Sequence, residues 1–284
     1  MGFVINNNLA ANNTYRSLNA TQSDLSKSLE KLSTGLRINR AGDDAAGLSI
    51  SEGLKAQVTG SAQAARNAQD GISVIQTTEG ALTEVHSILQ RVRDLTVQAA
   101  NDSNNDDART AIGAEVKALG SELDRMAKTV NFNGINLLDN SAGEAGDGKL
   151  KLQVGAGTGA DSQITVDLNS VAGEDVGTIA TAISGLDLTK ASTANAALAT
   201  IDTHIQGVST ARANLGATQN RLEHTIKSLN VAGENLQAAQ SRIADVDMAA
   251  EMVKFTKANI LSQAGTAMLA QANQSSQGVL SLLR

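Results

Sequence analysis

The chain contains, near its N-terminus, the stretch TYRSLNATQSDLSKSLEKLSTGL, residues 14–36. Leucine recurs in it every seven residues, and further leucines fill the positions between polar flanks. A seven-residue apolar repeat is typical of a helix that packs along a seam against a partner helix. The stretch therefore predicts a long helix that needs a partner. The leucines of this stripe are Leu18, Leu25, Leu29, Leu32 and Leu36.

A second apolar stripe occupies the other end of the chain, over residues 248–284. Amphipathic helices at the two termini can pair only if the chain folds back on itself, so we expect the termini to lie together. The region between them is expected at the far end of the molecule. The C-terminal stripe comprises Met252, Phe255, Ile260, Leu261, Met268, Leu269, Leu280, Leu282 and Leu283.

The middle of the chain predicts three more helical segments, over about 44–101, 107–130 and 193–247, from apolar residues spaced three and four apart. Between the second and third, residues 139–193 are rich in Gly, Asp, Ser and Thr. Two alternating runs in this region predict a β-hairpin. These runs are Leu150, Leu152 and Val154, and then Ile164, Val166 and Leu168.

The expected fold is therefore mainly α: a long antiparallel helical bundle or coiled-coil rod with a small β-hairpin insertion and paired terminal helices. We expect residues 1–43 and 248–284 to form a terminal coiled-coil domain. Residues 44–247 are expected to form a helical rod, with the hairpin region at about 140–190 and no extra outer domain.

The composition favours an elongated helical protein over a compact enzyme. The 284 residues are 41% hydrophobic, yet they include only three Phe and one Tyr, with no Trp, Pro or Cys. Without proline nothing forcibly ends a helix, so very long helices are permitted. The net charge of −6, the lack of a Lys/Arg cluster and the scarcity of aromatic residues argue against a nucleic-acid partner.

Residues 1–20 lack the basic start and the apolar stretch of a Sec-type signal peptide, and no apolar run approaches a membrane span. We therefore expect no membrane partner and, for an exported protein, a different export route. His86, His204 and His224 are far apart and form no metal-binding motif, and Gly155, Gly157 and Gly159 fit a hairpin link better than a phosphate cradle. The sequence thus predicts no enzyme, no cofactor and no metal site.

The terminal stripes indicate self-association. Five buried leucines contribute at most about 1.5–3 kcal/mol each. Ordering some forty residues costs about 1–2 kcal/mol of backbone entropy apiece, and helical hydrogen bonds offset only part of this. We therefore expect both termini to be poorly ordered in the monomer and to become helical on assembly. The alternative is that the stripes form the core of an intramolecular bundle, which is the better interpretation for the middle helices.

Several segments of the chain resemble segments of bacterial flagellins, and they occur in the same order along the sequence. The resemblance covers about residues 1–140 and 195–284. The segments are LSTGLRIN at 32–39, DDAAGL at 43–48, NAQDGIS at 67–73, QTTEGAL at 76–82, QRVRDL at 90–95, FNG at 132–134, SRIADVD at 241–247 and VLSLLR at 279–284.

The resemblance implies a structural subunit that polymerises into the bacterial flagellar filament for motility, outside the cell. It implies that the chain travels unfolded through the flagellar type III export apparatus, with an export chaperone, and adds beneath the filament cap. Hook-associated proteins are implied as further partners. The alternative is a hook–filament junction or cap-associated adaptor. Such adaptors generally resemble the flagellin pattern less fully at the C-terminus, so the full match of VLSLLR favours the filament subunit.

Two groups of residues follow as candidate sites. The first is a set of residues for self-assembly. Its charged members could alternatively belong to a solvated loop, with the acids capping a helix. The second is a possible contact for the vertebrate Toll-like flagellin receptor, with the alternative that its charged members merely pack neighbouring subunits. The self-assembly set is Leu18, Leu25, Leu29, Leu32, Leu36, Arg37, Asp43, Asp44, Ile260, Leu269, Leu280 and Leu283, and the receptor set is Arg91, Leu95 and Glu115.

Overall fold

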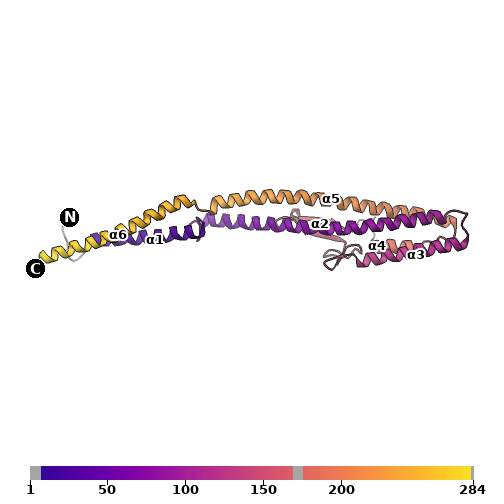
Figure 1. Cartoon of the computed structure of the whole chain (residues 1–284), viewed down its shortest axis with the longest axis horizontal. Helices are drawn as coiled ribbons and strands as arrows, with labels where there is room; N and C mark the ends of the chain where they lie inside the picture. Colours follow the sequence, from indigo (N-terminus) through magenta and orange to yellow (C-terminus); the bar gives the residue numbers. More distant parts are fainter. Residues whose placement is uncertain (1–7, 169–174, 283–284) are drawn as a thin grey trace. The chain divides into compact units, whose positions relative to one another are not determined.

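The computed structural model describes residues 8–168 and 175–282, and it describes side chains as far as residue 274. Its described elements are helices α1 to α6, a short 3₁₀ helix and two antiparallel strand pairs (Figure 1). Contacts divide the chain into two compact units. We call residues 57–234 the central unit, and the residues up to 56 and from 235 onward the terminal unit.

The terminal unit is built on helices α1 (Leu9–Thr34) and α6 (Met248–Leu282), which lie side by side (Figure 1). The two helices are antiparallel, since Asn8 at the start of α1 contacts Ala272 near the end of α6. Asn8 also caps α1, because its side chain accepts a hydrogen bond from the backbone of Ala11. Gly35 ends α1 in the left-handed conformation, with φ of 73°, which glycine adopts without steric cost.

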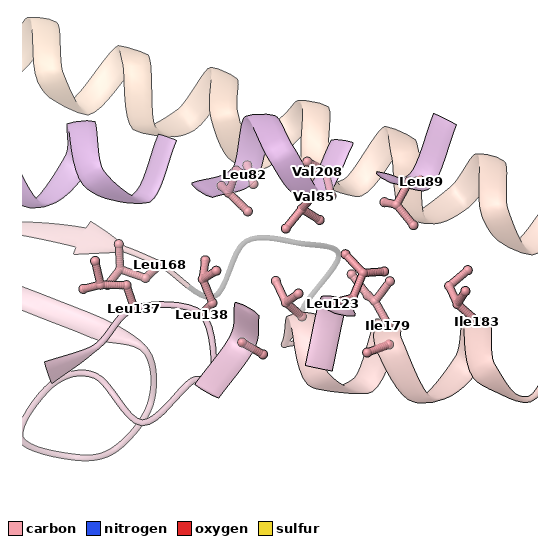
Figure 2. Close-up of a cluster of buried hydrophobic side chains, with 14 of the residues drawn as sticks. Leu82, Val85, Leu89, Leu123, Leu137, Leu138, Leu168, Ile179, Ile183 and Val208 are labelled. Carbon is pink, nitrogen blue, oxygen red and sulfur yellow. The ribbon is translucent and has the colours of Figure 1, made fainter. Parts of the chain in front are cut away.

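The central unit contains most of α2 (Ala45–Ala99) and α5 (Ala191–Ala244), together with α3 (Asp106–Thr129) and α4 (Val176–Ser184). The long helices α2 and α5 are joined by the ion pair Arg93–Asp202, with 2.6 Å between nitrogen and oxygen. Figure 2 shows the core, in which Leu and Val of α2 meet Leu123 of α3 and Ile179 of α4. This unit therefore has an apolar interior of its own.

Two strand pairs lie on the central unit. Strands β3 (Lys149–Gln153) and β4 (Gln163–Asp167) form the predicted hairpin, in which Leu150 faces Val166 and Leu152 faces Ile164. The link between them includes the 3₁₀ helix η1 (Ala160–Ser162). The expected mainly α fold with a small hairpin is confirmed, and the helices begin and end within a few residues of their predicted limits.

Two elements were missed by the sequence reasoning. Strands β1 (Asn131–Phe132) and β2 (Ile135–Asn136) pair around Asn133 and Gly134, whose φ angles are 50° and 79°. Two positive φ values in a two-residue loop are typical of the hairpin turn that the dipeptide Asn-Gly favours. The Asn133–Gly134 pair could therefore have predicted this turn from the sequence. Helix α4 lies within the Gly-, Asp-, Ser- and Thr-rich residues 139–193, where no helix was predicted. Its signal was Val176, Ile179 and Ile183 after a capping Asp175.

Helices α3 and α4 approach closely at Gly120, which is buried. A Cβ atom there would overlap the side chain of Ser184 and would lie 3.3 Å from the backbone oxygen of Ala180. The absence of a side chain at residue 120 therefore permits the contact between the helices.

We expect Gly120→Val to destabilise the central unit by about 1–3 kcal/mol, because the added atoms force the two helices apart. Gly113→Val is the matched control on the same helix, since a Cβ at Gly113 would have no atom within 4 Å. Thermal unfolding measured by circular dichroism should show a lower midpoint for the first variant alone. Equal midpoints for the two variants would contradict this interpretation of the contact.

Candidate functional site

The face of α1 that meets α6 is a heptad seam of alternating leucines and small polar residues. Every third or fourth residue is buried or half-buried, whereas most residues between them are exposed. Three leucines of the predicted stripe thus lie in an intramolecular seam. The residues of the seam are Ala11, Thr14, Leu18, Thr21, Leu25, Ser28 and Leu32.

The facing seam of α6 is composed mostly of small side chains. Gly265 lies opposite Leu18, and a Cβ at this glycine would be 3.1 Å from Leu18 Cδ1. Small residues allow two helices to approach closely, but they bury little apolar area. The seam of α6 consists of Glu251, Phe255, Ala258, Ser262, Gly265, Leu269 and Ala272.

The large apolar side chains of α6 lie mainly outside this seam. Apolar residues occur on all sides of the helix, and several of them line a hollow with Thr256 and Lys257. We call these side chains the outer face of α6. Its members, all at least half or nearly half exposed, are Met248 50%, Met252 50%, Val253 69%, Ile260 61%, Leu261 49% and Met268 62%.

Helix α1 also exposes apolar side chains away from the seam, at Leu9, Tyr15 and Leu29. Leu36, just beyond the helix, is exposed as well and pairs through its backbone with Asp245. Of the predicted assembly leucines, Leu29 and Leu36 are therefore open to a neighbour. We call Leu9, Tyr15 and Leu29 the outer face of α1.

The terminal unit buries very few apolar side chains. Among the residues whose side chains are described, the buried hydrophobic residues of this unit are Ile38, Ala244 and Ala258, whereas the central unit buries a continuous cluster. Most of the exposed large hydrophobic residues belong to the terminal unit. Surface of this kind marks an interaction site in a soluble protein.

The connection between α1 and α2 is held by contacts within the chain. Arg37 donates two hydrogen bonds to the backbone oxygen of Ile243, at 3.1 and 2.7 Å, and so satisfies a carbonyl near the end of α5. Its guanidinium also lies 3.9 Å from Asp44. Asp44 accepts a hydrogen bond from the backbone N–H of Gly47 at 2.8 Å, which caps the start of α2.

Asp43 likewise acts on the backbone, since it accepts hydrogen bonds from the N–H groups of Arg40 and Asn39. These two bonds lower the pKa of the Asp43 carboxyl. Arg40 forms an ion pair with Glu30 at 3.0 Å. Asp44 thus has the helix-capping role of the alternative interpretation, whereas Asp43 holds the loop that precedes α2. A role for Arg37, Asp43 and Asp44 between subunits stays a prediction.

A buried polar contact crosses the α1–α6 seam. Ser28 donates a hydrogen bond from Oγ to Glu251 Oε1 at 2.7 Å, and Lys254 Nζ lies 3.0 Å from Oε2 of the same carboxylate. The Ser28 hydrogen bond, and after it the contact with Lys254, holds the pKa of Glu251 below its ordinary value against the effect of burial. The sequence reasoning missed this pair, although a charged residue at a seam position was the available signal.

The remaining predicted residues are placed as follows. Ile260 lies on the outer face of α6 and Leu269 in its seam. The side chain of Leu280 and the whole of Leu283 lie outside the described residues. In the receptor set, Arg91 donates to Glu115 at 2.8 Å and both are half exposed, whereas Leu95 is buried in the core of the central unit.

Comparison with known proteins identifies the family. Residues 5–143 match the bacterial flagellin N-terminal helical region, and residues 198–283 match the bacterial flagellin C-terminal helical region. A flagellin of Halalkalibacterium halodurans is 52% identical over 99% of this chain and 100% of its own length. A flagellin of Bacillus subtilis is 51% identical over 99% of both chains. The chain belongs to the bacterial flagellin family.

A putative flagellar hook-associated protein from Vibrio parahaemolyticus has a similar fold. The TM-score is 0.56 at 15% identity, over 72% of this chain and 100% of that one. At so low an identity the likeness shows the fold alone.

As a member of the flagellin family, the chain is a structural subunit of the extracellular flagellar filament, as its motifs predicted. Within residues 8–168 and 175–282, no helix is long and apolar enough to cross a membrane. In the same part of the chain, no three His, Asp or Glu side chains lie close enough together to hold a metal ion. The exposed apolar faces of the terminal unit are therefore the candidate functional site of this flagellin.

We expect the Ser28–Glu251 contact to make the stability of the terminal unit depend on pH. A carboxyl whose pKa is lowered in the folded state stabilises that state above its unfolded pKa, near the ordinary value of 4.5. This contribution is lost as the pH falls through the lower, folded-state pKa. Glu251→Gln should therefore be less stable than the wild type near neutral pH and lose less stability on acidification. Denaturant unfolding of assembled filaments, followed by circular dichroism, measures both effects.

The control for this experiment is Glu84→Gln, because Glu84 is an exposed carboxylate on α2. It should follow the wild-type dependence on pH. A Glu251→Gln variant with the same acid sensitivity as the wild type would show that the buried carboxylate does not contribute.

Proposed function

We propose that subunits of the filament contact one another through the outer faces of α1 and α6. One observation carries this proposal: α6 bears apolar side chains on all sides, and α1 covers only its seam of small residues. A helix that is apolar all round is normally buried on all sides. Within one chain the terminal unit does not provide this cover, so further copies are the natural partners of a filament subunit.

The directions of these side chains favour a polymer over a dimer. Successive residues of an α-helix are about 100° apart, so residues seven apart lie on nearly the same side. Val253 and Ile260 form one stripe, and Leu261 and Met268 form a second that is turned by about 100°. Met252 points in a third direction, between the first stripe and the seam. A single flat neighbour does not cover all three directions, whereas several surrounding subunits do.

The expected energies are adequate for assembly. Full burial of one Ile, Leu or Met side chain contributes about 1.5–3 kcal/mol. Two or three such side chains per contact therefore supply several kcal/mol, before the cost of association is deducted. Each subunit repeats these contacts with several neighbours. An adaptor at the hook–filament junction, the alternative function, would not need apolar side chains in every direction.

We expect Ile260→Asp to abolish filament formation, because a charge is then placed where a neighbouring subunit should bury an apolar side chain. Ile260 is exposed in the monomer, so the variant should keep the wild-type helix content. Electron microscopy of the purified protein after salting-out, together with circular dichroism of the monomer, measures both properties. Long tubes formed by the variant would contradict the proposal.

The matched control is Val97→Asp. Val97 is an exposed apolar residue on α2 in the central unit, at 47% exposure. This variant should still form long tubes. Tubes from Val97→Asp together with none from Ile260→Asp would assign the contact to the terminal unit. Short oligomers from the wild-type protein would instead favour the adaptor.

The partners implied by the family resemblance belong to the same proposal. An apolar surface that awaits other subunits has to be kept from premature association inside the cell, and this supports an export chaperone that covers the terminal helices. Passage through the flagellar export apparatus, addition beneath the filament cap and contact with hook-associated proteins complete the proposal. The terminal domain of residues 1–43 and 248–284 would be the part of the subunit that carries these contacts.

We propose separately that the vertebrate Toll-like flagellin receptor contacts Arg91 and Glu115. Their ion pair is half exposed on α2 and α3, which supports an accessible charged site. The buried Leu95 would act only by holding this part of α2 in place.

We expect Arg91→Ala to weaken receptor binding by the monomer about tenfold or more, since an arginine at the centre of an interface often contributes over 1.4 kcal/mol. The affinity is measured directly with purified receptor ectodomain. Arg66→Ala, an exposed arginine on the same helix, is the control and should bind as the wild type does. Unchanged affinity of the Arg91 variant would contradict a receptor contact at this residue.

A further inference from the structure

Methionine is concentrated on the outer face of α6. Of the five methionines in the chain, Met248, Met252 and Met268 are exposed there, at 50%, 50% and 62%. Met126 is partly buried against the core of the central unit. Met1 lies outside the described residues. The exposed thioethers that the structure describes thus all belong to the helix proposed to carry the subunit contacts.

These thioethers are the exposed sulfur atoms among the residues whose side chains the structure describes. The chain has no cysteine, so no thiol competes for an oxidant. Exposed methionine is oxidised to the sulfoxide, which turns a flexible apolar side chain into a polar one.

We propose that Met252 and Met268 are oxidation sites through which a hydroperoxide controls assembly of the subunit. The inference rests on the proposed role of the outer face of α6 in subunit contacts. In the reaction the thioether sulfur forms a bond to one peroxide oxygen and the O–O bond breaks. The other oxygen takes up the proton of the transferred oxygen and leaves as water from hydrogen peroxide, or as an alcohol from an organic hydroperoxide. The sulfur loses two electrons and the peroxide gains them, so no further reactant is needed.

The position of the two residues explains why their oxidation matters. Met252 lines the apolar hollow with Ile260 and Leu261, and Met268 continues the stripe of Leu261 one heptad further along α6. A sulfoxide at either site carries a strongly polar oxygen into a contact that should be dry. Burying such a group without a hydrogen-bond partner is unfavourable.

Assembly should in turn protect these residues. In the free subunit both side chains are open to solvent, whereas in a filament the neighbouring copies would cover them. Oxidation would therefore mark subunits that have not yet been incorporated and leave the finished filament largely unaltered. Reduction of the sulfoxide by a methionine sulfoxide reductase would return a marked subunit to the assembling pool.

The test oxidises the full-length monomer with hydrogen peroxide, maps the sulfoxides by peptide mass spectrometry and then induces polymerisation. The yield of filaments is measured by sedimentation and electron microscopy. The filament yield of the oxidised wild-type protein should fall at least about tenfold. A tenfold change in an equilibrium corresponds to about 1.4 kcal/mol. Treatment with sulfoxide reductases and a thiol reductant should restore the yield.

The deciding variant is Met248→Leu, Met252→Leu, Met268→Leu, which keeps the apolar volume of the face and removes its sulfur. Its filament yield after peroxide is compared with the yield of the same variant without peroxide, and the two yields should be equal. Loss of assembly in the oxidised variant as well would overturn the inference, since another lesion would then be responsible. Wild-type protein that carries both sulfoxides and assembles normally would also overturn it.

Failure of the underlying function gives a different pattern. If Ile260→Asp forms ordinary tubes, the outer face of α6 does not carry subunit contacts, whatever the peroxide experiment shows. If Ile260→Asp forms no filaments and the oxidised wild type still assembles, the contact role of the outer face of α6 is supported. The oxidation inference alone is then wrong. Peroxide treatment of finished filaments adds an independent measurement, because it should oxidise Met252 and Met268 more slowly than in the monomer.

Discussion

The close contact of α1 with α6 through small side chains is the constraint on which the terminal unit depends. Gly265 opposite Leu18 lets the helices approach, and Ala258 and Ser262 continue the same narrow seam. A close approach through small residues fixes the pairing but buries little apolar area, and area determines most of the hydrophobic stabilisation. The apolar side chains that would have strengthened the pair lie instead on the outer face. The pairing of the two termini therefore produces the exposed apolar surface that we propose for contacts between subunits.

The same chain follows the opposite rule in its central unit. There Leu89, Leu123 and Ile179 are fully buried, and α3 and α4 close the interior formed with α2 and α5. This unit can fold without another copy because its apolar residues find partners within the chain. The terminal unit has few such partners, and its stability is linked to assembly by mass action. On the proposal that the outer faces of α1 and α6 bind other subunits, the terminal unit gains further stability when the subunit is incorporated.

The helices and strands with a periodic apolar pattern were predictable from the sequence. Which side chains pack against each other was less predictable. Leu150 and Val166 alternate with polar residues, and Ile112 and Val116 follow the helical period, so the hairpin and the long helices were identified close to their limits. Helix α4 was missed because it is only nine residues long and follows a Gly- and Asp-rich segment. The heptad leucines showed that α1 has a seam, but not that small residues such as Gly265 would face Leu18. Which of two apolar faces is covered depends on packing, which periodicity alone does not reveal.

The buried Ser28–Glu251 contact explains how a seam with little apolar area can still be specific. Apolar seams tolerate shifts along the helix axis, because one leucine can replace another, whereas a buried carboxylate is satisfied only where its donors lie. Ser28 supplies such a donor from α1 in one register, whereas Lys254 contacts Glu251 from within α6 itself. Asn8 fixes the far end of α1 to the backbone of Ala272. The register in turn decides which side chains of α6 point outward. A shift by one residue would rotate Ile260 and Met268 away from the positions they now hold, so the polar contact maintains the apolar surface presented to other subunits.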